Sequence, residues 1–299
     1  MLEIMMRIEL PTLALTVAVY AAWLLLTWLA GDGHVVAFPL LAVLLALHSS
    51  LQHEHIHGHP TPHDALNAWL AGWPLGLWLP YSVYRRSHRE HHASEALTDP
   101  RRDAESFYVD ESRFAAMSAP RRAWRVALQT LLGRLLLGPV EMVRATIVEE
   151  TRRRPALDRA TRRAERMGLV GHGLGVVVVL TWLVIVCEVS PVLYAIAAVY
   201  PGMSLTLLRS YAEHRPHQRH EHRTNVVESR LLGWLYLHNN LHVVHHEHPG
   251  LPWYRLPKRW RADRSRHVNA GVLVYPGYRA LLRYAVVPKD SPVHPGTTS

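Results

Sequence analysis

The chain has 299 residues, a formal net charge of +9 and a single cysteine, Cys187. One cysteine excludes an intramolecular disulfide framework and leaves too few thiolates for a Cys-ligated iron–sulfur cluster or a zinc ribbon. The positive charge is compatible with nucleic acid, but the Arg residues lie beside long apolar stretches, where anionic lipid headgroups are the simpler partner. We therefore expect membrane lipid, and no nucleic acid, as a partner.

Four apolar stretches alternate with segments rich in Arg and His, at about residues 10–30, 35–48, 168–186 and 192–208. About twenty apolar residues cross a hydrocarbon core of roughly 30 Å. The pattern predicts a single all-α integral-membrane domain over residues 1–299, with four transmembrane helices in two hairpins. A cleaved signal peptide is the weaker interpretation of the first stretch, because Trp23 and Trp28 stand where such a peptide carries small residues.

Residues 65–84 are also apolar, but Pro74 and Pro80 interrupt them. A proline removes a helical hydrogen bond, and non-helical backbone is not tolerated in contact with lipid. We therefore expect an interfacial or re-entrant segment here rather than a straight span.

Two charged segments, residues 85–167 and 209–287, are predicted to form aqueous lobes, with an amphipathic piece at about 124–143 along the membrane surface. The turns of the two hairpins contain no Lys or Arg, whereas both lobes are rich in Arg. The positive-inside rule then places both lobes in the cytoplasm, most simply at a bacterial inner membrane. Residues 288–299 are expected to be a flexible tail.

The 22 histidines of the chain are far above the usual share, and three clusters contain the densest of them. One cluster has an HxxxH pattern and the other two share HxxHH: His53 and His57, then His88, His91 and His92, then His242, His245 and His246. On a helix, residues at i, i+3 and i+4 share one face, so each HxxHH should present three imidazoles to a common point. A single HxxxH is compatible with surface histidines, but two copies of HxxHH beside apolar segments favour a metal site.

The ligand type alone does not choose the metal, because imidazole suits iron, zinc, copper and nickel. Eight ring nitrogens suit two metal ions, since one ion would use three or four of them. A structural zinc closes at four ligands and a hydrolytic zinc needs about three protein ligands, so the arrangement favours redox iron.

The three clusters, in this order and in this relation to two apolar hairpins, resemble the histidine boxes of the membrane fatty acid desaturase superfamily. The resemblance covers about residues 10–257. This superfamily also contains hydroxylases, alkane monooxygenases and terminal-alkene-forming fatty acid decarboxylases. The resemblance implies a centre of two Fe ions that uses O2 to abstract hydrogen from a fatty acid or acyl-lipid chain; it assigns no catalytic residue beyond the iron ligands.

The same resemblance implies a further metal-binding histidine just after the last span, where His214 stands. Desaturases can use an Asn that reaches one iron through water; Asn239 and Asn240 precede the third cluster, but neither is assigned this role. The sequence His248-Pro249-Gly250-Leu251 is similar to the haem loop of fused cytochrome b5 domains, but the second glycine of that loop is absent. A separate electron donor of ferredoxin or rubredoxin type, with its reductase, is therefore expected.

Two other functions compete with this interpretation. The segment His53-Glu54-His55-Ile56-His57 also matches HExxH, the signature of zinc proteases in which two His bind zinc and Glu is the base, but a membrane zinc protease leaves both HxxHH clusters unexplained. Metal transporters keep coordinating groups near the middle of their spans, where this sequence has few. Desaturation is the expected activity, and hydroxylation and oxidative decarboxylation, which begin with the same hydrogen abstraction, are the alternatives.

Overall fold

The computed structural model describes residues 8–93 and 97–297. These residues are mostly helical, and the strands β1 (Val226–Val227) and β2 (Val274–Tyr275) form a small parallel pair. The expected all-α fold is confirmed. Residues 1–7 of the expected domain, residues 94–96 of its first lobe and residues 298–299 of its tail lie outside the described residues.

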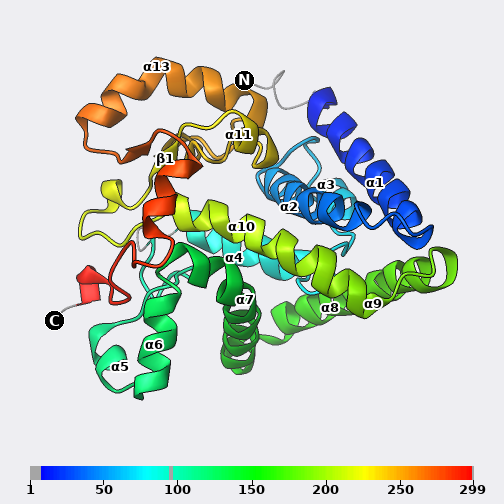
Figure 1. Ribbon diagram of the computed structural model, residues 1–299, viewed down its shortest axis with the longest axis horizontal. Coiled ribbons are helices and arrows are strands. Elements are labelled where there is room, and N and C mark those ends of the chain that lie inside the picture. Colours follow the sequence, from blue (N-terminus) through cyan, green and yellow to red (C-terminus); the bar gives the residue numbers. More distant parts are fainter. Residues whose placement is uncertain (1–7, 94–96, 298–299) are drawn as a thin grey trace. The chain divides into compact units, whose positions relative to one another are not determined.

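Figure 1 labels most of the α-helices. The α-helices are α1 (Leu10–Gly31), α2 (Ala37–Ile56), α3 (Asp64–Ala71), α4 (Tyr81–Ala93), α5 (Glu111–Ala115), α6 (Ala119–Ala127), α7 (Leu131–Arg153), α8 (Arg159–Thr181), α9 (Pro191–Tyr194), α10 (Tyr200–Glu213), α11 (Leu231–Leu235), α12 (His242–Glu247) and α13 (Leu256–Asn269). Two π-helical segments continue the apolar helices, η3 (Trp182–Val186) after α8 and η4 (Ala195–Val199) between α9 and α10. The 3-10 helices are η2 (Arg154–Ala156), η5 (His220–His222), η6 (Trp253–Arg255), η7 (Tyr278–Tyr284) and η8 (Pro295–Thr297).

Three helices of the described chain have the length and hydropathy of a membrane span: Leu10–Gly31, Arg159–Val186 and Pro191–Glu213. The pair α6 and α7, bent by 114° at a short break, becomes a fourth if it is one broken span. The first two of these helices end where the sequence predicts. The second begins earlier than expected, because Asp158 caps its N-terminus by accepting hydrogen bonds from the next turn.

Most of the expected span at residues 35–48 lies inside α2, which begins at Ala37 and continues past His53 to Ile56. Its last two turns are therefore polar, and α2 is not among the helices with span-like hydropathy in the described part of the chain. A crossing by α2 stays a prediction. Residues 65–84 form no straight span, since α3 ends at Ala71 and α4 begins after Pro80, as the prolines indicate.

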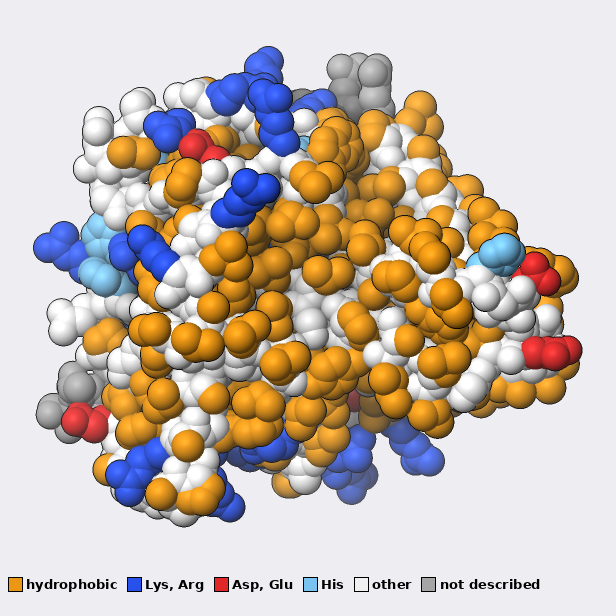
Figure 2. Space-filling view, in the orientation of Figure 1, with side chains coloured by type: hydrophobic (Ala, Val, Ile, Leu, Met, Phe, Trp, Pro, Cys, Tyr) orange, Lys and Arg blue, Asp and Glu red, His pale blue; other side chains and the backbone are white. Residues whose placement is uncertain are grey.

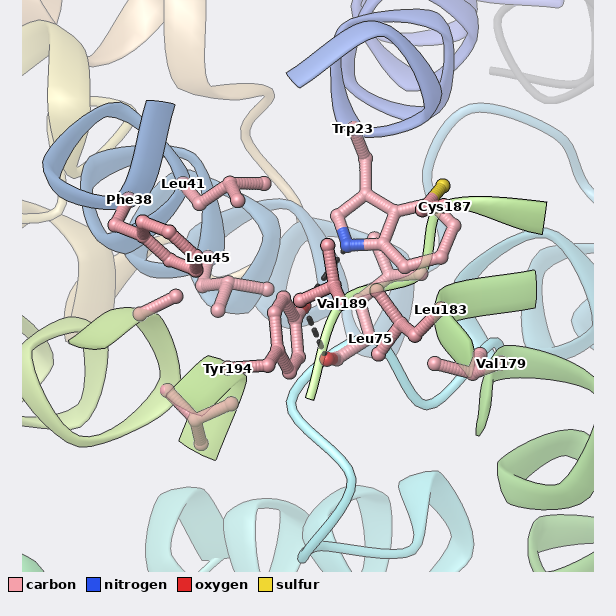
Figure 3. Close-up of a cluster of buried hydrophobic side chains, with 12 residues drawn as sticks. Trp23, Phe38, Leu41, Leu45, Leu75, Val179, Leu183, Cys187, Val189 and Tyr194 are labelled. Carbon is pink, nitrogen blue, oxygen red and sulfur yellow. Dashed lines mark hydrogen bonds between the residues drawn. The ribbon is translucent and has the colours of Figure 1, made fainter. Parts of the chain in front are cut away.

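The chain divides into two compact units, one formed by residues up to 86 with 147–206, the other by residues 87–146 and those from 207 onward. In the first unit, α1 and α2 lie side by side (Figure 1). Its core, drawn in Figure 3, is tied by two hydrogen bonds: Trp23 Nε1 donates to the hydroxyl of Tyr194 at 2.8 Å, and that hydroxyl donates to the main-chain oxygen of Leu75 at 2.8 Å. These bonds satisfy polar groups that would otherwise be orphaned in an apolar core.

Hydrophobic side chains also cover the outside of the first unit, where Figure 2 shows them gathered over α1 and α9. Among them, Leu25 is 58% exposed, Ile185 is 72% exposed and Val192 is 67% exposed. A helix that is apolar on its outer as well as its inner side is expected where the surrounding medium is lipid.

The second unit is built around two apolar clusters on either side of β1. Val226 packs with Leu256 and Trp260 of α13 in one cluster, while Val227 packs with Tyr211 and Leu281 in the other. The alternation follows from the strand, whose successive side chains point to opposite faces. This strand also anchors the start of α12, which carries the third histidine cluster.

The chain beyond Pro288, which the sequence predicts to be a flexible tail, contacts the second unit at several points. The amide of Lys289 donates to the main-chain oxygen of Gln129 at 2.8 Å, and the main chains of Val109 and residues 292–294 exchange two hydrogen bonds of 2.9 and 3.0 Å. The ring of His294 lies 3.0 Å from Thr98 Oγ1. These long-range contacts leave no local sequence pattern, because each partner lies more than a hundred residues away along the chain.

Candidate metal centre

The helix α4 carries the second histidine cluster on its last turns. His88 and His92 are one helical turn apart, and their ring centroids lie 4.6 Å from each other. The His91 ring points in a different direction, 5.7 Å from the ring of His88 and 5.8 Å from that of His92. Both His88 and His91 are 2% exposed, so these rings belong to the interior of the lobe and are not a solvated surface.

The third cluster begins α12 directly after a tight reversal of the chain. Leu237 has a φ of 48° and His238 a φ of 58°, in the left-handed region that non-glycine residues adopt mainly in turns. The turn is held by Asn240, which accepts a hydrogen bond of 2.9 Å from the amide of Val227 and donates one of 2.6 Å from its side chain to the oxygen of the same residue. Asn240 thus joins β1 to the start of α12, a structural contact.

His214 lies one residue beyond the end of α10, at the position where the sequence places a further ligand. The main chain on both sides of it is paired with a later segment: Glu213 accepts from the amide of Asn225 at 2.7 Å, and the amide of Arg215 donates to Arg223 at 3.1 Å. This short pairing keeps His214 from continuing the helix and fixes the direction of its ring.

Four of these rings form one set, which we call the four-histidine set: His91, His214, His242 and His246. Each offers a ligand atom, and all four atoms lie within 4.8 Å of one another. His242 Nε2 is 2.8 Å from His214 Nε2 and 3.0 Å from His246 Nε2. Two imidazole nitrogens bound to one metal ion at about 2.1 Å, at right angles, lie about 3 Å apart. The spacing therefore suits a shared metal ion.

A second group in the same unit, the three-histidine set, consists of His88, His92 and His245, whose ligand atoms also lie within 4.8 Å of one another. His245 Nε2 is 3.0 Å from His92 Nε2. Each HxxHH motif is thus divided, with its first and last His in one set and its middle His in the other. The expectation that each motif points to a common centre is wrong, because residues i and i+4 project in nearly the same direction while i+3 is rotated to the other side.

Carboxylates stand behind three of the rings, on the Nδ1 side: Asp103 lies 2.9 Å from His91, Glu105 lies 3.1 Å from His88, and Glu213 lies 3.4 Å from His242. A ring that donates its Nδ1 hydrogen to a carboxylate keeps the lone pair of Nε2 for a metal. Sequence reasoning missed all three carboxylates. The only local signal was that Glu213 directly precedes His214, and the loop that carries Asp103 and Glu105 has no periodic pattern.

In the four-histidine set, the pKa of His91 is raised while those of the other three rings are lowered. Burial lowers the pKa of His214 to about 3, and lowers those of His242 and His246 well below the usual value, so these rings are neutral. Burial also opposes a charge on His91, but the neighbouring carboxylate of Asp103 outweighs it and raises the pKa to about 9. The carboxylates therefore favour a positive charge at this place, which a proton or a metal cation can supply.

The residues present fit a metal ion on three grounds. The donors are imidazoles, which suit iron and its neighbours in the periodic table. Their nitrogens converge at distances compatible with shared coordination. The Nε2 atom of His91 is buried and has no hydrogen-bond partner among the described residues, and such orphaned buried atoms are rare without a ligand.

The first cluster lies in the first unit, on the last turn of α2. The rings of His53 and His57 are one helical turn apart, with centroids 4.7 Å from each other. The intervening His55 has partners of its own, with Nδ1 2.7 Å from the oxygen of Leu51. His59 pairs with Glu9 at 3.0 Å. The two histidines of the HxxxH pattern thus share one helix face, as the sequence predicts.

A model of the family described as fatty acid desaturase matches residues 27–276. The chain belongs to the fatty acid desaturase family. A search of the curated proteins finds no match to the chain. The matched region includes all three histidine clusters and His214. Membership makes the protein an oxidoreductase of the desaturase and hydroxylase type, with a membrane location, a fatty acyl substrate and histidine clusters suited to the iron that the family uses.

A residue beyond the matched region also contacts the candidate metal centre. The side chain of Lys289 is 4% exposed, and its ammonium group donates to the main-chain oxygen of His214 at 2.8 Å and to that of Tyr211. It lies 4.7 Å from the centre of the Tyr211 ring. Burial lowers the pKa of Lys289 to about 8. The start of the last segment of the chain thus holds the backbone from which His214 projects.

Proposed function

We propose that this protein is an O2-dependent fatty acyl desaturase that uses a His-ligated di-iron centre to abstract hydrogen from an acyl chain. The observation that carries the proposal is the presence of two histidine sets in one lobe, each compact enough for a metal ion. Family membership supports the iron and the acyl substrate. Hydroxylation and terminal-alkene-forming decarboxylation are the alternatives within the same superfamily.

We assign the ligands of the two irons by set. The four-histidine set binds one iron, and the three-histidine set binds the other together with His53 and His57. The assignment of these last two rests on the HxxxH pattern, on their shared helix face and on the need of a three-ligand set for further donors. When bound, the iron pair supplies the activation of O2 needed to break an unactivated C–H bond.

The protein's own residues prepare this centre in three ways. The neutral rings of the four-histidine set offer lone pairs without first losing a proton, since burial lowers the pKa of most of them. The carboxylates of Asp103 and Glu105 orient the rings of His91 and His88 through Nδ1. The Nδ1 atom of His242 has the main-chain oxygen of Asn239 as its hydrogen-bond partner, at 3.3 Å. Burial excludes water from the donors, and this protects a reactive centre from side reactions.

We further propose that both lobes face the cytoplasm of a bacterial cell, and that a separate electron donor of ferredoxin or rubredoxin type, with its reductase, supplies the electrons. The charge distribution supports this orientation, because the hairpin turns lack Lys and Arg while the lobes are rich in Arg. A basic surface favours the approach of an acidic redox protein.

Elemental analysis of the purified protein is the first test. Two irons per chain are expected, one for each histidine set. Incubation with acyl substrates, O2 and a reducing system, followed by mass spectrometry, then separates the activities. A product lighter by two hydrogens supports desaturation, a product heavier by one oxygen supports hydroxylation, and a terminal alkene one carbon shorter supports decarboxylation.

A membrane zinc protease is the distant alternative, because Glu54 stands in an HExxH pattern. Zinc bound in place of iron, together with loss of a peptide-cleaving activity in Glu54→Gln, would establish it. The proposal requires the opposite: iron in the purified protein and no peptide cleavage by the unaltered chain.

A further inference from the structure

An apolar surface of the second unit is exposed along the first turns of α7. Leu132, Leu136 and Val140 are spaced four residues apart, so they form one stripe on the helix. Their exposed fractions are 46%, 62% and 51%. An adjacent side of the same turns faces inward, since Leu131 and Leu135 pack into the core of the unit. The stripe is therefore an outward-facing surface.

Residues 282–287, which begin in η7 and continue beyond it, extend this surface. The amide of Leu132 donates a hydrogen bond of 3.0 Å to the main-chain oxygen of Ala285, which joins the segment to the start of α7. Leu282, Val286 and Val287 on this segment are 63%, 74% and 57% exposed. Their neighbour Leu281 is fully buried, so the backbone is fixed and the three apolar side chains are held outward. The sequence predicts residues 282–287 only as part of the second charged lobe, whereas the stripe on α7 lies within the amphipathic piece expected at about residues 124–143.

We infer that this surface, formed by Leu132, Leu136, Val140, Leu282, Val286 and Val287, inserts into the headgroup and upper acyl region of a bilayer that contains anionic lipid. Contiguous exposed apolar side chains mark a binding surface, and a bilayer is the partner that the remaining features of this surface fit. The inference concerns membrane contact alone and does not depend on the activity proposed above.

Charge supports a lipid partner. The sequence contains no Asp or Glu from residue 119 to 140 or from 271 to 289, so no carboxylate on either segment opposes anionic headgroups. Arg279 and Arg283 are exposed on η7. The guanidinium of Arg283 lies 4.7 Å from the centre of the Tyr284 ring. Tyrosine and arginine beside apolar side chains are typical of the membrane interface.

Continuity with a membrane-type segment also supports a lipid partner. The helix α7, together with α6, forms the bent pair that has the hydropathy of a broken span or a re-entrant loop. The stripe on α7 therefore belongs to a segment already suited to lipid contact, and residues 282–287 widen that contact. A second copy of the chain or a soluble protein is the competing occupant, and the test must separate both from lipid.

Spin labelling of the full chain in lipid vesicles tests the inference. The native cysteine is removed by Cys187→Ala, and Val286→Cys is then introduced and labelled with a nitroxide. Ser265→Cys, an exposed position on α13 between two arginines, is the matched control. The vesicles contain phosphatidylethanolamine and phosphatidylglycerol. Collision of the label with apolar O2 and with a water-soluble nickel complex is measured for each variant.

The Val286→Cys label should collide more with O2 than with the nickel complex, and the Ser265→Cys label should show the reverse order. Equal, water-like behaviour at the two positions would overturn the inference. Low collision with both reagents at Val286→Cys would also overturn it, because it means that protein covers the surface. Leu136→Cys serves as a second position on the same surface, so that a poorly folded Val286→Cys variant does not leave the test undecided.

Discussion

Replacing Asp103 by Asn should lower the metal affinity of the candidate centre while the lobe stays folded. The Asp103 carboxylate has 1% of its side chain exposed; one oxygen lies 2.9 Å from His91 Nδ1 and accepts from the amide of Glu105 at 2.9 Å, while the other accepts from the amide of Thr98 at 2.7 Å. An Asn oxygen can keep the bond from Thr98. Its NH2 group then faces the Nδ1–H of His91 and the amide of Glu105. These groups are all hydrogen-bond donors, so none of them has an acceptor at this place.

With the amide in this orientation, a neutral His91 relieves the opposition by moving its proton from Nδ1 to Nε2, the nitrogen that should bind the metal. A hydrogen bond to a charged partner contributes about 1.5–3 kcal/mol, and each 1.4 kcal/mol is about tenfold in an equilibrium constant. Metal affinity should therefore fall by about 10- to 100-fold, the range usual when a ligand loses the group that orients it.

The assay is iron retention by the purified protein during titration with a chelator. Asp99→Asn is the matched control, because Asp99 lies on the same loop and loses the same charge, but its side chain accepts from the amide of Arg101. The Asp103→Asn variant should lose iron at a lower chelator concentration than this control. Equal retention by the two variants would refute the argument that the carboxylate fixes the tautomer of His91.

Three further predictions concern other parts of the chain. His245→Ala should remove iron and activity together while the protein stays in the membrane; retained iron with lost activity would contradict the ligand assignment. Gly31→Ala should lower the unfolding temperature, because an added Cβ would lie 1.8 Å from the main-chain oxygen of Cys187 and such overpacking costs about 1–3 kcal/mol; an unchanged midpoint would contradict the close approach. Burial lowers the pKa of His294 in the folded protein from 6.5 to about 4. As the pH falls, a His294 that has left its packed position therefore takes up a proton at a higher pH than the packed ring does. The stabilisation of residues 290–294 by the contact with Thr98 is then present above about pH 6.5 and lost toward pH 4, which hydrogen exchange should report. The same pH dependence in His294→Gln would exclude this cause.

Much of the fold and the identity of the proposed ligands can be predicted from the sequence, because both leave local patterns. Long apolar runs indicate spans, and HxxHH on a helix keeps its histidines within one turn of each other. The polar end of α2 makes the second span harder to recognise from the sequence. A helix can continue past its apolar residues when the polar side chains of its last turns find partners inside the protein.

The parts that could not be predicted depend on contacts between distant segments. The helix repeat separates the i+3 histidine of each HxxHH motif from the other two, but which rings of α4 meet which rings of α12 depends on how the two helices are placed, and neither helix encodes that placement. The carboxylate of Asp103 reaches His91 from an irregular loop, and Lys289 reaches the backbone of His214 from the end of the chain. Such groups are indistinguishable in sequence from ordinary surface charges.

The division of the motifs has a consequence for how the centre fills with metal. The helices α4 and α12 each contribute ligands to both sets, and neither helix can shift at one set without moving its ligands at the other. Binding of the first ion should therefore restrict both helices, and the second ion should meet donors that are already ordered. Loading should be cooperative, so that partly loaded preparations contain mainly empty and doubly occupied chains, with few that hold a single ion.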